Sequence, residues 1–228
     1  MNTISVETIP AKLELNAAVP DFEAQTTMGM IRLSEWAQNK WVILFSHPAD
    51  FTPVCTTELV AFAKLQNEFE QKHVALLGCS VDSIYSHIAW MRNIQEKFNV
   101  DINFPVIADL DQKISRLYGM IHEPSSNTAT VRCVFFIDPK RILRAMIYYP
   151  MNVGRNFDEI MRVVDALQIV DANKVACPAN WQYGKEVIVP APVTMGDANQ
   201  RAENKEYELK DWYFALKKLP ETQLSKGD

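Results

Sequence analysis

The sequence predicts an α/β domain with a central mixed sheet, followed by a C-terminal segment of different character. Three observations predict this class: short apolar runs of strand length, helical patterns between and after them, and a change in amino-acid composition beyond residue 170. The chain has 228 residues, 48% of them hydrophobic. That length and composition suffice for one sizeable core and an appendage.

The strand predictions follow the apolar runs along the chain. Residues 41–45 read Trp-Val-Ile-Leu-Phe, a continuous run typical of a central strand buried on both faces. Residues 74–81 form a second such run and residues 134–137 a third. The Asp-Pro-Lys sequence at 138–140 marks a turn before the β-rich stretch 142–149, so the last pair is expected to form a hairpin.

Two stretches show apolar side chains at near-helical spacing. They are Leu59, Phe62, Leu65 and Phe69 in the first stretch and Ile160, Val163, Val164 and Leu167 in the second. Asn156, followed three residues later by Glu159, resembles a capping box at the start of the second helix. Strands that alternate with helices and close in a hairpin predict an α/β domain over residues 1–170, compatible with a thioredoxin-like fold.

Residues 171–228 read as an extended arm. Pro178, Pro190 and Pro192 interrupt a segment with few helical signals, and residues 201–218 are dense in charge. Four large aromatic groups are too many to leave in water, so we expect the arm to pack on the core or on another subunit. These groups are Trp181, Trp212, Tyr213 and Phe214.

Charge and cysteine usage exclude several classes of protein. The net charge of −5 and the lack of a basic block argue against a nucleic acid or an anionic membrane as partner. Residues 1–10 do not resemble a secretory signal, and no run reaches the roughly 18 apolar residues of a membrane span. The four cysteines are widely spaced, which fits neither a disulfide scaffold nor a metal site and favours a cytoplasmic location.

One cysteine lies in a context that activates sulfur. Thr52 is a good N-cap and Pro53 suits the first helical position, which places Cys55 in the first turn of the predicted helix. The positive end of the helix dipole there favours the thiolate over the thiol. An ordinary cysteine is only a few per cent thiolate at neutral pH, so a nucleophilic one needs this help.

These residues carry a resemblance to a known family. Pro48, Thr52 and Cys55 match the Pro-x-x-x-Thr-x-x-Cys motif of peroxiredoxins, and His47 before the proline is similar to the one-cysteine class. Three further segments resemble the same class in the same order, so the resemblance covers nearly the whole chain. They are Val131-Arg132, residues 154–159, and residues 178–181 with 187–192.

The resemblance implies roles for these residues. Cys55 would be the peroxidatic cysteine, Thr52 would bond the peroxide and position the sulfur, Pro48 would shield the thiolate and Arg132 would activate it. A guanidinium and a hydroxyl suit this chemistry because negative charge develops on the leaving oxygen.

Supporting roles are implied for a carboxylate and a second arginine. Glu58 would orient Arg132 and Arg155 would support it, although Arg155 also fits a structural ion pair with Asp158 or Glu159. The resemblance also implies that His47 is one of the substrate-binding residues, with Pro48, Thr52 and Arg132. By its chemistry, His47 fits either a residue that tunes the site or an ordinary loop histidine. The other histidines have no ligand-like spacing and are expected at ordinary polar positions. They are His73, His87 and His122.

The function implied is thiol-dependent reduction of hydrogen peroxide and organic hydroperoxides through a cysteine sulfenic acid. An external thiol, glutathione or a thioredoxin-type protein, would reset the enzyme, with no metal or organic cofactor. The family also implies a homodimer with exchanged arms or a larger homo-oligomer. A peroxide sensor or redox-regulated holdase is the alternative, whereas a disulfide oxidoreductase is disfavoured because Thr52 stands where its first cysteine would be.

Two departures from the class are visible. The tail between Tyr207 and Ala215 has no cysteine, so a resolving cysteine is absent there, and no Gly-x-Ser-x-Gly elbow precedes the first strand, so no lipase activity is predicted. Cys79 and Cys133 lie in predicted strands and are expected in the core. Cys177 lies at the foot of the arm, where a resolving role stays open.

Overall fold

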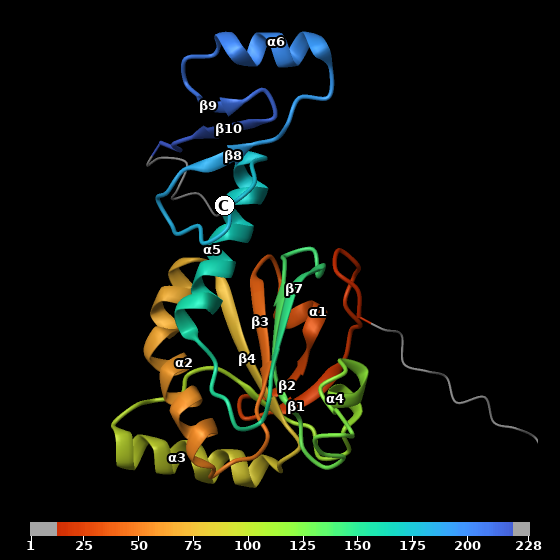
Figure 1. Ribbon diagram of the computed structural model, residues 1–228. Coiled ribbons are helices and arrows are strands. Elements are labelled where there is room, and N and C mark those ends of the chain that lie inside the picture. The colour runs from red at the N-terminus through yellow and green to blue at the C-terminus, as the bar shows by residue number, and fades with distance from the viewer. Residues whose placement is uncertain (1–12, 221–228) are drawn as a thin grey trace, which may run out of the picture. The chain divides into compact units, whose positions relative to one another are not determined.

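The computed structural model describes residues 13–220, which fall into two compact units that meet between Arg155 and Asn156. The first unit contains a seven-stranded sheet and four helices (Figure 1). Its strands are β1 (Glu23–Thr26), β2 (Gly29–Arg32), β3 (Trp41–Ser46), β4 (Val74–Ser80), β5 (Val106–Ala108), β6 (Arg132–Ile137) and β7 (Leu143–Tyr149). Its helices are α1 (Leu33–Trp36), α2 (Pro53–Gln71), α3 (Ile84–Phe98) and α4 (Lys113–Leu117).

The sheet is mixed, with strand order β2-β1-β5-β4-β3-β6-β7. Strands β3, β4 and β5 run parallel, and β6 and β7 add an antiparallel hairpin beside β3. The predicted central strand, the second strand and the hairpin are therefore confirmed. The mixed α/β class predicted from the sequence is confirmed as well.

The alternation of side chains along β3 builds a core on each face of the sheet. Val42 and Leu44 join a buried cluster that also contains Leu33 of α1 and Ile114 of α4. Phe45 points to the opposite face, where its ring stacks on Phe62 of α2 with centroids 3.8 Å apart. Accordingly α1 and α4 lie on one side of the sheet and α2 and α3 on the other (Figure 1).

The second unit is more regular than an extended arm. It contains helices α5 (Phe157–Asn173) and α6 (Met195–Glu203) and the strands β8 (Val187–Val189), β9 (Glu208–Asp211) and β10 (Phe214–Lys217), which pair in the order β8-β10-β9. Trp181 is buried in the core of this unit with Ile169 and Val187. This small sheet was not predicted from the sequence, because its strands have only three or four residues and little alternation.

The sequence prediction of a first domain over residues 1–170 includes most of helix α5, whereas the helix falls in the second compact unit. The boundary near residue 170 stays a prediction, since compactness alone does not define the domains of a family. Among the helices of residues 13–220, none is both long and apolar enough to cross a membrane.

Candidate active site

The first turn of α2 places Cys55 beside strand β6. Phe51 has a left-handed backbone with φ of 54°, and Thr52 is extended at the N-cap, so the chain turns sharply from the loop into the helix. Pro53 occupies the first helical position, as predicted. Backbone N–H groups in a first turn have no intrahelical partner, and Cys55 is buried among them.

Arg132, the first residue of β6, brings a guanidinium to the sulfur. Its Nη1 donates a hydrogen bond to Cys55 Sγ over 3.3 Å, although the two residues are 77 positions apart in the sequence. Its Nε and Nη2 both donate to the carbonyl oxygen of Met151, at 2.9 and 2.6 Å. All three nitrogens of the Arg132 guanidinium are thus fixed, so its positive charge lies next to the Cys55 thiol.

Glu58, one helical turn after Cys55, is shared by both arginines. Its Oε2 accepts from Arg132 Nη1 at 2.6 Å and from Arg155 Nη2 at 2.7 Å. Its Oε1 accepts from the backbone N–H and Nε of Arg155 at 2.8 and 3.0 Å. All three side chains are buried, and the single negative charge of Glu58 neutralises only one of the two guanidinium charges.

The remaining donors of Arg155 tie the loop to the sheet. Its Nη1 donates to the carbonyl oxygens of Ser46 and Cys133, at 2.8 and 3.0 Å. Its guanidinium also lies 5.3 Å from the ring centroid of Phe45. Burial lowers the pKa of Arg155, and Glu58 opposes that shift. The sequence left open an ion pair of Arg155 with Asp158 or Glu159. In the structure, the carboxylate that pairs with Arg155 within the first unit is Glu58.

Thr52 and Pro48 lie in the loop between β3 and α2. The Thr52 hydroxyl donates to the carbonyl oxygen of Ala49 at 2.8 Å and makes no side-chain cap to α2, so the predicted N-cap position is correct but its side-chain bond is not formed. Pro48 is buried. With its proton directed at Ala49, the Thr52 oxygen keeps its lone pairs for another donor.

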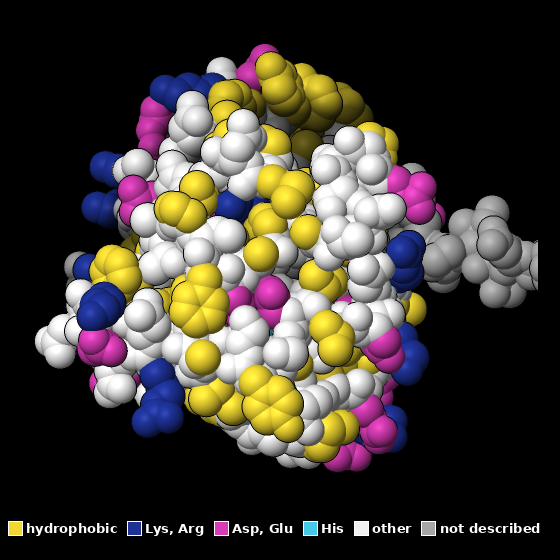
Figure 2. All heavy atoms as spheres, turned by 90° about the horizontal axis from the view of Figure 1, so that it is seen from below, with side chains coloured by type: hydrophobic (Ala, Val, Ile, Leu, Met, Phe, Trp, Pro, Cys, Tyr) yellow, Lys and Arg dark blue, Asp and Glu magenta, His cyan; other side chains and the backbone are white. Residues whose placement is uncertain are grey.

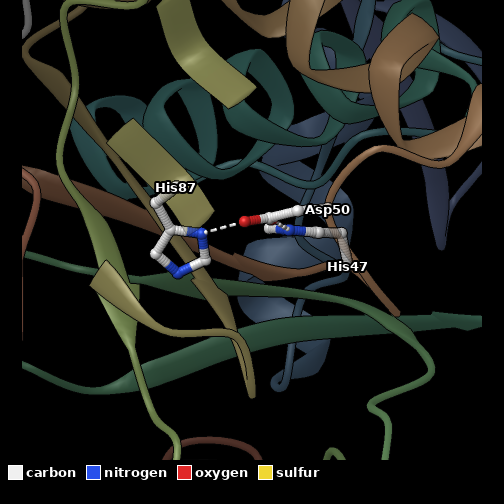
Figure 3. A group of neighbouring side chains, drawn as sticks. All are labelled: His47, Asp50 and His87. Atoms are coloured by element: carbon white, nitrogen blue, oxygen red, sulfur yellow. Dashed lines mark hydrogen bonds and ion pairs between the residues drawn. The ribbon is translucent and has the colours of Figure 1, made fainter. Parts of the chain in front are cut away.

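His47 belongs to a buried cluster with Asp50 and His87 (Figure 3). The carboxylate of Asp50 lies between the two imidazoles, with His47 Nε2 at 2.8 Å from Oδ1 and His87 Nδ1 at 2.8 Å from Oδ2. These three side chains offer ligand-type atoms within 4.8 Å of one another. Hydrogen bonds between the cluster's own members account for this proximity, so it gives no positive support to a bound metal.

The sequence does not identify Asp50 as part of this cluster, and the prediction of an ordinary polar position for His87 is wrong. In the structure His87 is fully buried. A signal was present in the helical pattern: His87 shares its spacing with Trp90 and Ile94, which form the buried face of α3. A histidine on such a face must find a polar partner, but only the tertiary structure shows that Asp50 is that partner.

The other three cysteines differ from Cys55 in their surroundings. Cys79 in β4 and Cys133 in β6 are buried in the core, as predicted. Burial raises the pKa of Cys79 well above its usual value and that of Cys133 to about 12. Cys177 is half-buried, donates to the carbonyl oxygen of Ala166 and has a pKa raised by burial. Thiols held protonated in this way are poor nucleophiles.

Comparison with known proteins assigns the family. Residues 15–146 match the model of the AhpC/TSA family, and residues 166–205 match the C-terminal domain of 1-Cys peroxiredoxin. A peroxiredoxin 2 of Caldanaerobacter subterraneus is 50% identical over 222 residues, covering 96% of this chain and 100% of the relative. A peroxiredoxin of Aquifex aeolicus is 52% identical over 215 residues, covering 90% and 96%.

Solved structures agree with this assignment. A yeast mitochondrial 1-Cys peroxiredoxin, described with a thiol resolving mechanism via glutathione/thioredoxin systems, has 40% identity and a TM-score of 0.81 over 91% of this chain and 100% of its own. A Cys-to-Ser mutant of peroxiredoxin 6 from Arenicola marina has 35% identity and a TM-score of 0.83 over 92% and 99%. The chain therefore belongs to the AhpC/TSA family and is a peroxiredoxin of the one-cysteine type, a thiol-dependent peroxidase.

Proposed function

We propose that the Cys55 thiolate is the nucleophile that reduces hydrogen peroxide and small organic hydroperoxides. The observation that carries this assignment is the hydrogen bond of 3.3 Å from the fixed guanidinium of Arg132 to the buried Cys55 sulfur. Two guanidiniums and one carboxylate leave one uncompensated positive charge beside that sulfur. A thiolate at Cys55 neutralises this charge, and the thiolate is the form of cysteine that acts as a nucleophile.

The proposed reaction uses these donors in sequence. The thiolate attacks one oxygen of the hydroperoxide, an S–O bond forms as the O–O bond breaks, and the other oxygen leaves as hydroxide or alkoxide. The hydroperoxide proton passes to the leaving oxygen, which gives water or an alcohol and leaves a sulfenate on Cys55. The sulfenate takes up a proton from solvent, equivalent to the one that the thiol lost, and becomes the sulfenic acid, Cys–S–OH. Arg132 and the free N–H groups of the first turn stabilise the charge that develops on oxygen.

The proposed site also contains Thr52 and Pro48, and it is supported by Glu58 and Arg155. The Thr52 hydroxyl donates to Ala49, so it offers a lone pair to the O–H of the bound hydroperoxide. Pro48 is buried and shields the sulfur from water. Glu58 orients Arg132 through a bond of 2.6 Å, and Arg155 fixes Glu58 in turn.

An external thiol of glutathione or thioredoxin type is the proposed reductant of the sulfenic acid. Cys79 and Cys133 are buried in the sheet with pKa values raised by burial, which supports a cycle with one reactive cysteine. The wide spacing of the cysteines also supports a reducing, cytoplasmic location. No observation favours the alternative of a sensor or holdase over an enzyme.

Replacement of Cys55 by Ser tests the proposal. We expect Cys55→Ser to abolish consumption of hydrogen peroxide with dithiothreitol as reductant, because the nucleophile is lost with little change in volume. Cys177→Ser is the matched control and should keep the wild-type rate. Peroxide consumption by Cys55→Ser at the wild-type rate would refute the proposal.

Mass spectrometry after one equivalent of hydrogen peroxide tests how the enzyme is reset. A one-cysteine cycle predicts sulfenic acid on Cys55, which an added dithiol removes. A disulfide between Cys55 and Cys177 as the main product would instead identify Cys177 as a resolving cysteine.

A further inference from the structure

A cavity of about 490 Å³ lies in the first unit, at the end of the sheet away from Cys55. Val74, Ala75 and Leu76, the first residues of β4, line it. Val74 pairs with Trp41 at the start of β3, whereas Cys55 follows the other end of β3. The reaction proposed at Cys55 therefore does not use this cavity.

The first residues of β4 have a neighbouring strand on one side only. In a parallel ladder, successive residues direct their backbone groups alternately to the two sides. Gly78 faces β5, because its N–H donates to the carbonyl oxygen of Pro105 at 3.0 Å. By the same alternation Leu76 and Val74 face that side, whereas Ala75 faces β3.

The sequence explains why β5 does not extend alongside Leu76. The register of β4 with β5 would make Asn103 and Pro105 the bonding partners of Leu76. Pro105 has no N–H to donate, and the carbonyl oxygen of Asn103 accepts from Gln66 Nε2 at 3.2 Å. Among residues 13–220, the backbone N–H and C=O groups of Leu76 and Val74 have no hydrogen-bond partner.

These free backbone groups face the cavity. Val74 and Leu76 are only 2% and 3% exposed, and both line the cavity, so no other surface is open to them. Backbone groups without a partner are costly away from water. An extended peptide backbone carries donors and acceptors at the spacing of a strand, so it satisfies such an open edge by adding a strand to it.

The walls of the cavity suit the side chains of an added strand. Apolar surface comes from both faces and from the hairpin of β1 and β2. It is formed by Met28, Trp36, Leu76, Phe104 and Pro105. Pockets for alternate side chains beside a free strand edge are the features by which peptides are recognised in this mode.

The polar groups of the cavity favour an acidic ligand. Glu70 accepts a hydrogen bond from Gln66 Nε2 at 2.7 Å, so its carboxylate already has a donor. The ammonium of Lys40, which lines the same cavity, has no ion-pair or hydrogen-bond partner among residues 13–220. A negative group on the ligand complements this charge.

We propose that this cavity binds a short free peptide in an extended conformation, which adds a strand beside Val74 and Leu76 and brings an acidic group to Lys40. The volume lies in the range of small-ligand sites, which fits a peptide of a few residues. The inference is independent of the proposed reaction, because no residue of the cavity belongs to the site at Cys55.

Amide hydrogen exchange of the free protein, followed by NMR, tests the open edge. The N–H of Leu76 should exchange at least about tenfold faster than those of Ala75 and Leu77, which face β3. Equal protection of these three amides would overturn the inference, because the edge would then have a partner already.

Binding is tested by titrating the acetylated, amidated peptide Glu-Val-Leu-Val into the 15N-labelled protein. We expect shifts at Val74, Leu76 and the indole N–H of Trp36, and slower exchange at Leu76. The same peptide with both valine nitrogens methylated keeps the side chains but loses strand donors, so it should bind about tenfold more weakly or worse. Equal binding of the two peptides would refute strand addition, and no shifts with either would refute the site.

Lys40→Glu tests the charge preference. The peptide should bind this variant several-fold more weakly, whereas Lys64→Glu, exposed on α2 outside the cavity, should keep the wild-type affinity. Lys40→Glu should also consume hydrogen peroxide at the wild-type rate, and Cys55→Ser should bind the peptide normally. Wild-type affinity in Lys40→Glu would overturn the placement of the acidic group.

Discussion

At the scale of single residues, the site depends on one buried carboxylate that two arginines share. Both oxygens of Glu58 accept two hydrogen bonds each, and the donors belong to Arg132 and Arg155. Such an array is stable only while it is complete, because each buried charge has been removed from water. The same array carries a net positive charge next to the Cys55 sulfur, so the proposed reactivity depends on the same bonds as the buried structure.

Arg132→Lys should slow the oxidation of Cys55 by hydrogen peroxide about a hundredfold or more. An ammonium cannot donate to Cys55, Glu58 and Met151 together in the planar arrangement of the guanidinium. The second-order rate constant from stopped-flow kinetics measures the effect, with Arg92→Lys on α3 as a control. A rate within twofold of wild type would remove Arg132 from the site.

Glu58→Gln should lower the free energy of unfolding by about 3 kcal/mol at pH 7. The variant leaves two buried guanidiniums without their shared counter-charge. Chemical denaturation of the variant and of Glu68→Gln, elsewhere on α2, provides the comparison. Equal stabilities would mean that the guanidiniums do not require this carboxylate.

At the scale of elements, the N-termini of the helices differ in whether a side chain caps the first turn. Ser83 caps α3 and Asn156 caps α5, each side chain accepting from a backbone N–H in the first turn. Thr52 occupies the same position on α2, but its hydroxyl bonds Ala49 instead. The first turn that carries Cys55 therefore lacks a side-chain cap from Thr52, and in the proposed reaction its N–H groups stabilise charge on the sulfur and the substrate.

Asn156→Ala should destabilise the protein by about 1 kcal/mol, because the first turn of α5 loses its capping acceptor. Asn156→Asp retains the acceptor and adds a negative charge at the positive end of the helix, so it should be neutral or stabilising. Urea denaturation of both variants measures the difference. Equal loss in the two variants would show that the cap is not the cause.

At the scale of the whole molecule, acid should weaken the fold in two steps. The unfolded chain protonates His47 at about pH 6.5, whereas the folded protein holds its pKa lower. The unfolded state then binds more protons as the pH falls from 7 to 5, so the free energy of unfolding decreases. Asp50, whose folded pKa is also lowered, contributes stability above about pH 4 that is lost on further acidification.

The first of these steps is checked by denaturation between pH 7 and pH 5. His47→Gln should flatten the pH dependence in this range, and His73→Gln should leave it unchanged. A wild-type protein whose stability rises on acidification would contradict the sign of the expected effect.

Association with a second copy is the other expected property of the whole molecule. In the second unit Trp212 and Tyr213 are 57% and 53% exposed on the single chain. In the first unit Phe51, Tyr85 and Ile88 are exposed, and hydrophobic side chains gather over the middle of the face seen from below (Figure 2). Apolar groups of this size in water are consistent with the expectation, from the family resemblance, of a homodimer or larger assembly.

Light scattering tests the contribution of the second unit to assembly. The protein should have at least the mass of a dimer, and Trp212→Ser combined with Tyr213→Ser should reduce that mass. An unchanged mass would show that these aromatic groups do not form the interface.

The sequence alone was sufficient for the mixed α/β class, the central strand, the hairpin and the position of Cys55 in the first turn of a helix. Apolar runs and helix-start residues are local patterns, so they can be recognised without the fold. The small sheet of the second unit and the cap that Thr52 does not form were not predicted, because short strands and hydrogen bonds depend on neighbours that local patterns do not specify. Contacts between distant residues differ from these local patterns. The family resemblance implied roles for Arg132, Glu58 and Arg155 at Cys55, but local patterns do not specify their bonds, because Arg132 and Cys55 are 77 positions apart and Arg155 and Glu58 are 97 apart. The contact of His87 with Asp50, 37 positions apart, was not predicted at all. Only the tertiary structure decided these pairs, because burial selects each polar partner after the sheet and α2 and α3 have packed together.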